Sequence, residues 1–170
     1  MKHRILAVIC ALTLALTFGV FTGCQGSKGS VGYQLDMPQK GEEIAIMHTS
    51  MGDISIRFFP EAAPKAVENF KTHAKDGYYD GLTFHRVIND FMIQGGDPEG
   101  TGRGGSDETI KGEFSENGVK NDISHERGVI SMARSSDPDS ASSQFFIVQS
   151  DSTFLDGDYG AFGHVTEGMD

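Results

Sequence analysis

The sequence predicts a fold dominated by antiparallel β-strands, with one clear helix. Short runs of β-forming residues recur along the chain, and Gly-rich or Asp/Ser-rich segments separate them. Many short strands with few helices are typical of a β-sandwich or a β-barrel, and the pattern alone does not choose between the two. The 170 residues, 38% of them hydrophobic, suffice for one domain and a targeting segment.

Residues 1–23 are predicted to be a signal peptide. Lys2 and Arg4 precede an apolar run over 5–21, as in secretory signals. The run is also near the lower length for a membrane span, so an uncleaved anchor is the alternative. Residues 21–24, Phe-Thr-Gly-Cys, resemble a bacterial lipobox, although phenylalanine replaces the usual leucine at its first position. We therefore expect Cys24 to carry a lipid and to anchor an exported domain to the extracytoplasmic side of the cell membrane.

Residues 24–41 are predicted to be a flexible linker, followed by one domain over residues 42–170. The linker is rich in Gly, Ser, Gln and Lys and has no apolar period. Cys10 would leave with the signal peptide and Cys24 would carry the lipid, so no disulfide is expected.

The domain is predicted to start with a β-hairpin and a helix. Residues 44–47 and 53–58 flank a turn, and the second run alternates apolar and polar side chains. Pro64 suits a first helical turn and Gly77 a helix end, and Val67, Phe70 and Ala74 share one face between them. The later runs with β character are 83–88, 91–94, 128–132, 144–149 and 161–165.

Several motifs of the domain carry a family resemblance. Residues 84–97 read FHRVINDFMIQGGD, and residues 143–147 read SQFFI. In their order and spacing they resemble the cyclophilin-type peptidyl-prolyl cis/trans isomerases over about residues 43–170. Further matching segments are 59–70, 128–133, 154–157, 162–165 and 167–169.

The resemblance implies an antiparallel, eight-stranded closed β-barrel with two capping helices. The family's last helix and last strand would follow residue 170, so we expect both to be missing here and the domain to be incomplete at its C-terminus. The implied activity is peptidyl-prolyl cis/trans isomerisation of proline-containing polypeptides, without metal or cofactor, assisting the folding of exported proteins. The alternative is a non-catalytic module that binds prolyl peptides or acts as a chaperone. Most relatives act as monomers, and we expect the same here.

The resemblance also implies the site residues. Arg86 matches the catalytic arginine, and Gln94 matches a polar residue that acts with it. Strand alternation places Phe146 on the face of Gln144, whereas Phe145 and Ile147 point away, into the core. The implied substrate-binding residues are Phe91, Met92, Ala133, Arg134, Gln144, Phe146, Phe154, Leu155 and Tyr159.

Three of these positions depart from common members of the family. Phe154 stands where several eukaryotic members carry tryptophan, which implies weak binding of cyclosporin. Tyr159 replaces a frequent histidine, and its ring and hydroxyl are expected to retain activity. Arg134 replaces a frequent asparagine, and we expect it to change sequence preference at most.

Other functions are disfavoured by composition and context. The net charge of −10 argues against a nucleic-acid partner, which would need a basic face. Residues 100–105 contain GxGxxG, but neither an apolar strand before it nor a helix after it, so we expect a surface loop beside the groove. The six histidines have no metal-ligand spacing, and His85 is predicted to be structural.

Overall fold

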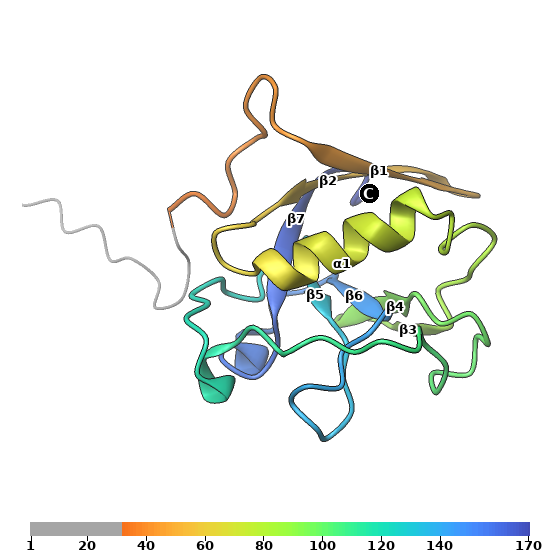
Figure 1. The fold of residues 1–170 in the computed structure, drawn as a ribbon. Helices are drawn as coiled ribbons and strands as arrows, with labels where there is room; N and C mark the ends of the chain where they lie inside the picture. The colour runs from red at the N-terminus through yellow and green to blue at the C-terminus, as the bar shows by residue number, and fades with distance from the viewer. Residues whose placement is uncertain (1–31) are drawn as a thin grey trace, which may run out of the picture.

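All seven predicted strand segments form strands of one antiparallel sheet. The computed structural model describes residues 32–170, and its strand order is β1-β2-β7-β5-β6-β4-β3 (Figure 1). Since β1 and β3 lie at the two edges, the sheet of the described residues is open, with seven strands where the resemblance implies a closed barrel of eight. The strands are β1 (Ile44–Thr49), β2 (Gly52–Phe58), β3 (Arg86–Ile88), β4 (Met92–Gly95), β5 (Val129–Met132), β6 (Phe145–Val148) and β7 (Ala161–Glu167).

One α-helix, α1 (Pro64–Lys75), lies across the sheet between the β1–β2 hairpin and the β3–β4 pair (Figure 1). As predicted, Pro64 occupies its first turn, and Gly77 follows its end in the left-handed region with φ +69°. Ala74, which is predicted on the face of Val67 and Phe70, is exposed, and Tyr79 packs on Phe70. The buried helical residues are Ala66, Val67 and Phe70.

The sheet separates two apolar clusters because alternate side chains of a strand point to opposite faces. The first cluster joins α1 to the sheet, and Phe70 packs on Phe145 and Phe162 in its centre. The second cluster lies on the other face and contains Met92, Phe146 and Leu155. Two 3₁₀ turns, η1 (Ser115–Asn117) and η2 (Thr153–Leu155), lie in the long connections.

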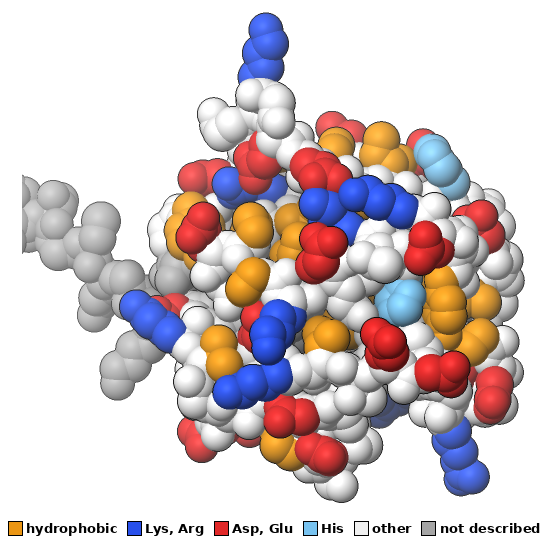
Figure 2. All heavy atoms as spheres, viewed as in Figure 1, with side chains coloured by type: hydrophobic (Ala, Val, Ile, Leu, Met, Phe, Trp, Pro, Cys, Tyr) orange, Lys and Arg blue, Asp and Glu red, His pale blue; other side chains and the backbone are white. Residues whose placement is uncertain are grey.

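On the face seen in Figure 2, acidic and basic side chains are interspersed. Among the residues described, no helix is both long enough and apolar enough to cross a membrane. The predicted signal peptide, the lipidation site at Cys24 and the first part of the linker lie outside the described residues.

The second part of the predicted linker differs from the expectation of a free tether. Gln34 is fully buried, and its Nε2 donates to the Ser124 carbonyl at 2.8 Å, while its Oε1 accepts from the Ser124 N–H at 3.0 Å. The ring of Tyr33 packs edge-on against Phe59, with centroids 5.7 Å apart, and Arg57 donates to the Tyr33 carbonyl. Residues 32–41 therefore pack on the domain, because one side-chain amide satisfies a backbone N–H and C=O that would otherwise be buried unpaired.

We expect Gln34→Ala to lower the free energy of unfolding by about 1–3 kcal/mol, because the buried Ser124 N–H loses its acceptor. Urea titration of the chain with and without the substitution measures this. Gln39→Ala is the matched control, since Gln39 is exposed and should change stability by less than about 0.5 kcal/mol. Equal effects of the two substitutions would show that residues 32–41 are not held by Gln34.

Candidate active site

The register of the sheet places four side chains in one row across four strands. Arg86 on β3 pairs with Gln94 on β4, Gln94 pairs with Phe146 on β6, and Phe146 pairs with Ser131 on β5. Directly paired residues of antiparallel strands point to the same face. A cation, an amide, an aromatic ring and a hydroxyl are therefore aligned on the face opposite α1.

A chain of hydrogen bonds orients the polar end of this row. Arg86 Nη1 donates to Gln94 Oε1 at 3.2 Å, and Gln94 Nε2 donates to Gln144 Oε1 at 2.8 Å. Gln144 Nε2 donates in turn to the Gly104 carbonyl at 2.6 Å. Because each amide uses its N–H on the next group, the oxygen of Gln94 is fixed towards Arg86. The guanidinium itself stays exposed, with further N–H groups free to bind a ligand.

The GxGxxG segment supplies the last acceptor of this chain. Its loop wraps around Asp97, whose buried carboxylate accepts from the backbone N–H groups of Glu99, Thr101 and Gly102. Burial alone would raise the pKa of Asp97, but the backbone hydrogen bonds together hold it below its ordinary value. As predicted, the segment is a loop beside the groove, and its carbonyl at Gly104 contacts the site.

Nine of the eleven predicted site residues line one open groove. The buried side chains of Met92, Phe146 and Leu155 form its apolar floor, and its two arginines are less buried. The other two predicted residues lie next to it: Gln144 is bonded to Gln94, and Phe154 is 70% exposed with its ring 5.6 Å from that of Phe91. The nine lining residues are Arg86, Phe91, Met92, Gln94, Ala133, Arg134, Phe146, Leu155 and Tyr159.

The division between groove and core follows the prediction from strand alternation. Phe146 belongs to the cluster beneath the groove, whereas Phe145 and Ile147 belong to the core under α1. The edge of Phe146 meets the Tyr159 ring at 5.7 Å and 86°. His85 is not among the lining residues; its ring nitrogens are enclosed, and they have no hydrogen-bond partner within residues 32–170.

A buried polar cluster beneath Phe146 is the part of the site that sequence reasoning missed. The His125 ring stacks on Phe146 with centroids 6.0 Å apart. Its Nδ1 lies 2.9 Å from Asp156 Oδ1, and its Nε2 lies 3.1 Å from Ser131 Oγ. The carboxylate accepts the Nδ1–H, so Nε2 accepts from the serine hydroxyl. His125 and Ser131 are fully buried, so this Ser-His-Asp set supports the Phe146 ring and is closed to a substrate.

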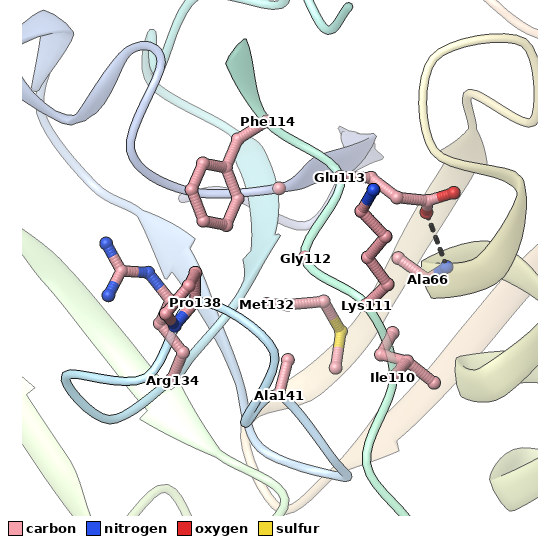
Figure 3. A pocket seen from close by; sticks show the side chains of 11 residues that line it. Ala66, Ile110, Lys111, Gly112, Glu113, Phe114, Met132, Arg134, Pro138 and Ala141 are labelled. Atoms are coloured by element: carbon pink, nitrogen blue, oxygen red, sulfur yellow. Dashed lines mark hydrogen bonds between the residues drawn. The ribbon is translucent and has the colours of Figure 1, made fainter. Parts of the chain in front are cut away.

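A second, smaller pocket is also lined by Arg134 (Figure 3). Glu113 is the one acidic residue among those that line it. This carboxylate accepts from the backbone N–H groups of Lys65 at 3.1 Å and Ala66 at 2.9 Å. It thereby caps α1, which has no side-chain cap of its own at Ala63. The Glu113 carboxylate therefore holds the start of the helix in place, with one backbone N–H bound to each of its oxygens.

Comparison with known proteins agrees with this geometry. Residues 44–170 match the model of the family described as cyclophilin type peptidyl-prolyl cis-trans isomerase/CLD. A Staphylococcus aureus (strain USA300) protein named as a peptidyl-prolyl cis-trans isomerase is 57% identical over 111 residues, which cover 65% of this chain and 55% of that protein. The chain thus spans about half the length of this curated relative.

Solved structures show the same similarity. A cyclophilin type peptidyl-prolyl cis-trans isomerase from Cryptosporidium parvum, crystallised in the presence of the dipeptide Ala-Pro, is 36% identical with a TM-score of 0.68. The match covers 74% of this chain and 80% of that chain. Cyclophilin AquaCyp293 from Hirschia baltica is 30% identical with a TM-score of 0.67, covering 76% of this chain and 65% of that one.

We expect the domain to lose stability as the pH falls below about 6.5, the ordinary pKa of histidine. Burial lowers the pKa of His125, although the hydrogen bond and charge of Asp156 oppose the shift. Below pH 6.5 the unfolded chain therefore binds a proton that the folded chain does not, until the pH reaches the lowered folded pKa. Urea titrations at pH 7.5 and 5.5 measure the free energy of unfolding. Between these two pH values it should fall less for His125→Gln than for the unsubstituted chain.

The control for this experiment is Lys120→Gln, an exposed substitution that leaves every histidine in place and should therefore keep the pH dependence of the unsubstituted chain. Burial also lowers the pKa of His73 and His164, and these two groups contribute equally to all three proteins. An identical loss of stability in His125→Gln and the unsubstituted chain would mean that His125 is not held neutral beneath Phe146.

Proposed function

Because the chain belongs to the cyclophilin type peptidyl-prolyl cis-trans isomerase family, we propose that it accelerates rotation about X–Pro peptide bonds. The observation that carries the proposal is the position of Arg86. Its guanidinium is oriented by Gln94 at one wall of a groove with an apolar floor. A prolyl ring needs such a floor, and the adjacent amide needs such a donor.

The chemistry requires neither a nucleophile nor a metal, because no covalent bond is broken. Rotation is slow because the nitrogen lone pair is delocalised into the carbonyl, which gives a barrier of about 18–20 kcal/mol. In the twisted state the lone pair returns to the prolyl nitrogen, which can then accept a hydrogen bond. A donor placed at this nitrogen binds the twisted state more tightly than either planar isomer, and so lowers the barrier.

Arg86 suits this role through its geometry. The guanidinium has five N–H groups and keeps its charge, and Gln94 takes one of them. The remaining groups can donate to the prolyl nitrogen and to a neighbouring carbonyl. An acceleration of about 10⁵ would require roughly 7 kcal/mol of preferential binding to the twisted state. A fixed guanidinium charge at Arg86 and a fixed amide dipole at Gln94 can contribute to this without reorganising during the reaction.

The floor of the groove holds the ring in place during the rotation. Met92, Phe146 and Leu155 are nearly fully buried and belong to one packed cluster. A prolyl ring seated on them is fixed, so the acyl side of the bond turns while the ring does not. The stacking of Phe146 on His125 keeps this floor in one position.

We further propose that the domain is lipid-anchored through Cys24 on the extracytoplasmic side of the membrane, and that its clients are exported proteins. The support is the apolar N-terminal run followed by the lipobox-like residues 21–24. Since Gln34 is docked on the domain, about ten residues separate the anchor from the first buried side chain. They span at most about 35 Å when extended, which would keep the groove near the membrane surface.

Arg86→Ala should reduce kcat/KM for cis-to-trans conversion of a proline-containing tetrapeptide by about 10²-fold or more, the loss typical for one transition-state donor. Arg86→Lys should retain part of the activity that Arg86→Ala loses, because lysine keeps the positive charge but lacks the planar set of guanidinium N–H donors. Arg103→Ala is the matched control, because Arg103 is an exposed arginine that does not line the groove. If Arg86→Ala and the unsubstituted chain bind the peptide and neither accelerates conversion, the domain is a binding module instead.

Cys24→Ser should move the exported protein from the membrane fraction to the soluble fraction when the full chain is expressed in a bacterium. The substitution removes the thiol that would carry the lipid. Cys10→Ser is the control, because Cys10 lies inside the predicted signal peptide and should leave the protein in the membrane fraction. Retention of Cys24→Ser in the membrane would instead support an uncleaved apolar anchor.

A further inference from the structure

Arg134 is a second arginine in the groove, and it stands across the sheet from Arg86. It follows β5 by two residues, whereas Arg86 opens β3, and β6 and β4 lie between these strands. Three strand spacings of about 4.8 Å separate β5 from β3 by roughly 14 Å. Both side chains line the same groove. A bound peptide would therefore meet one arginine at each side.

The guanidinium of Arg134 is held in a fixed position. Its Nε donates to the Asp158 carbonyl at 3.0 Å and its Nη1 donates to the Ser135 carbonyl at 2.9 Å. The carbon Cζ lies 4.8 Å from the centre of the Tyr159 ring and 5.0 Å from that of Phe114. Figure 3 shows Arg134 and Phe114 at the same end of the smaller pocket. Because the side chain is already ordered, binding an anion there would cost little further entropy.

No carboxylate neutralises this groove. Its nine lining residues include two arginines and no aspartate or glutamate, although the chain carries 24 acidic residues and a net charge of −10. Within residues 32–170, neither Arg86 nor Arg134 has a carboxylate oxygen within 4.0 Å. Asp139, which follows Pro138 of the smaller pocket, has its carboxylate bound to Asn117 and to the Gly112 N–H.

We propose that Arg134 determines substrate preference by binding an acidic side chain close to the proline, an inference that rests on the proposed function. If the proline sits beside Arg86, an extended peptide that advances about 3.3 Å per residue crosses to β5 in about four residues. Both arginines reach into the groove, so an Asp or Glu two or three residues from the proline would meet the guanidinium of Arg134. The free N–H groups of Arg134 can hold its carboxylate.

The test uses matched proline peptides that carry Glu or Gln at one position, from three residues before to three residues after the proline. For the unsubstituted chain, kcat/KM should be about fivefold higher for Glu than for Gln at the best position, mainly through KM, and the ratio should fall at 0.5 M salt. For the variants Arg134→Gln and Arg134→Met, the ratio of kcat/KM for the Glu peptide to kcat/KM for the Gln peptide should be close to one. The methionine variant keeps apolar contact with Phe114 and Tyr159, so it separates the charge from the packing.

Lys120→Gln is the charge-matched control, since Lys120 is exposed and does not line the groove, and it should keep the ratio of the unsubstituted chain. Ratios near one at every position in the unsubstituted chain, or an unchanged ratio in both Arg134 variants, would overturn the inference while isomerisation itself stands. The affinities of the same peptides are measured in parallel. If no peptide is turned over, the affinities decide. Tighter binding of the Glu peptide than of the Gln peptide by the unsubstituted chain, lost in both Arg134 variants, upholds the inference without the proposed function. Equal affinities of the unsubstituted chain for the two peptides overturn it.

Discussion

The antiparallel pairing of Gln94 with Phe146 is the constraint on which the rest of the site depends. It sets the register between β4 and β6, and through Arg86 and Ser131 it extends across four strands. A slip of one residue would turn Phe146 into the core and bring Phe145 to the groove, because side chains alternate along a strand. The packing of Phe145 on Phe70 opposes that slip. The helix-side core therefore protects the geometry of the opposite face.

Buried and half-buried polar groups hold the site rigid without entering it. Gln144 passes the orientation of Gln94 to a backbone carbonyl, and His125 supports the Phe146 ring from beneath. Each of these groups is satisfied by a hydrogen bond, so their burial costs little, and they leave the exposed N–H groups of Arg86 as the free donors of the row. A site that acts by preferential binding needs this stiffness, since a floor that moved with the substrate would bind all its states equally.

The fold and the groove could be predicted from the sequence to the extent that they follow from local pattern and family resemblance. Alternation separated Phe146 from Phe145, and the family resemblance named the nine residues that line the groove. Contacts between distant single side chains could not be predicted in this way. Gln34 meets Ser124 ninety residues later and His125 meets Asp156 thirty-one residues later, and neither contact leaves a periodic signal. The composition of residues 24–41 as a whole, rich in Gly, Ser, Gln and Lys, predicts a free linker, although one amide suffices to dock residues 32–41.

Those missed contacts form one connected structure. Ser124 receives Gln34 through its backbone, and its hydroxyl donates to Asp156 Oδ2 at 2.7 Å. The other oxygen of Asp156 accepts from the His125 backbone N–H at 2.7 Å and lies 2.9 Å from its ring. Three consecutive contacts thus connect Gln34 through Ser124 and Asp156 to His125, which supports the floor of the groove. Since a buried network is stable only when every member is paired, docking of Gln34 contributes to the same local stability that keeps Phe146 in place.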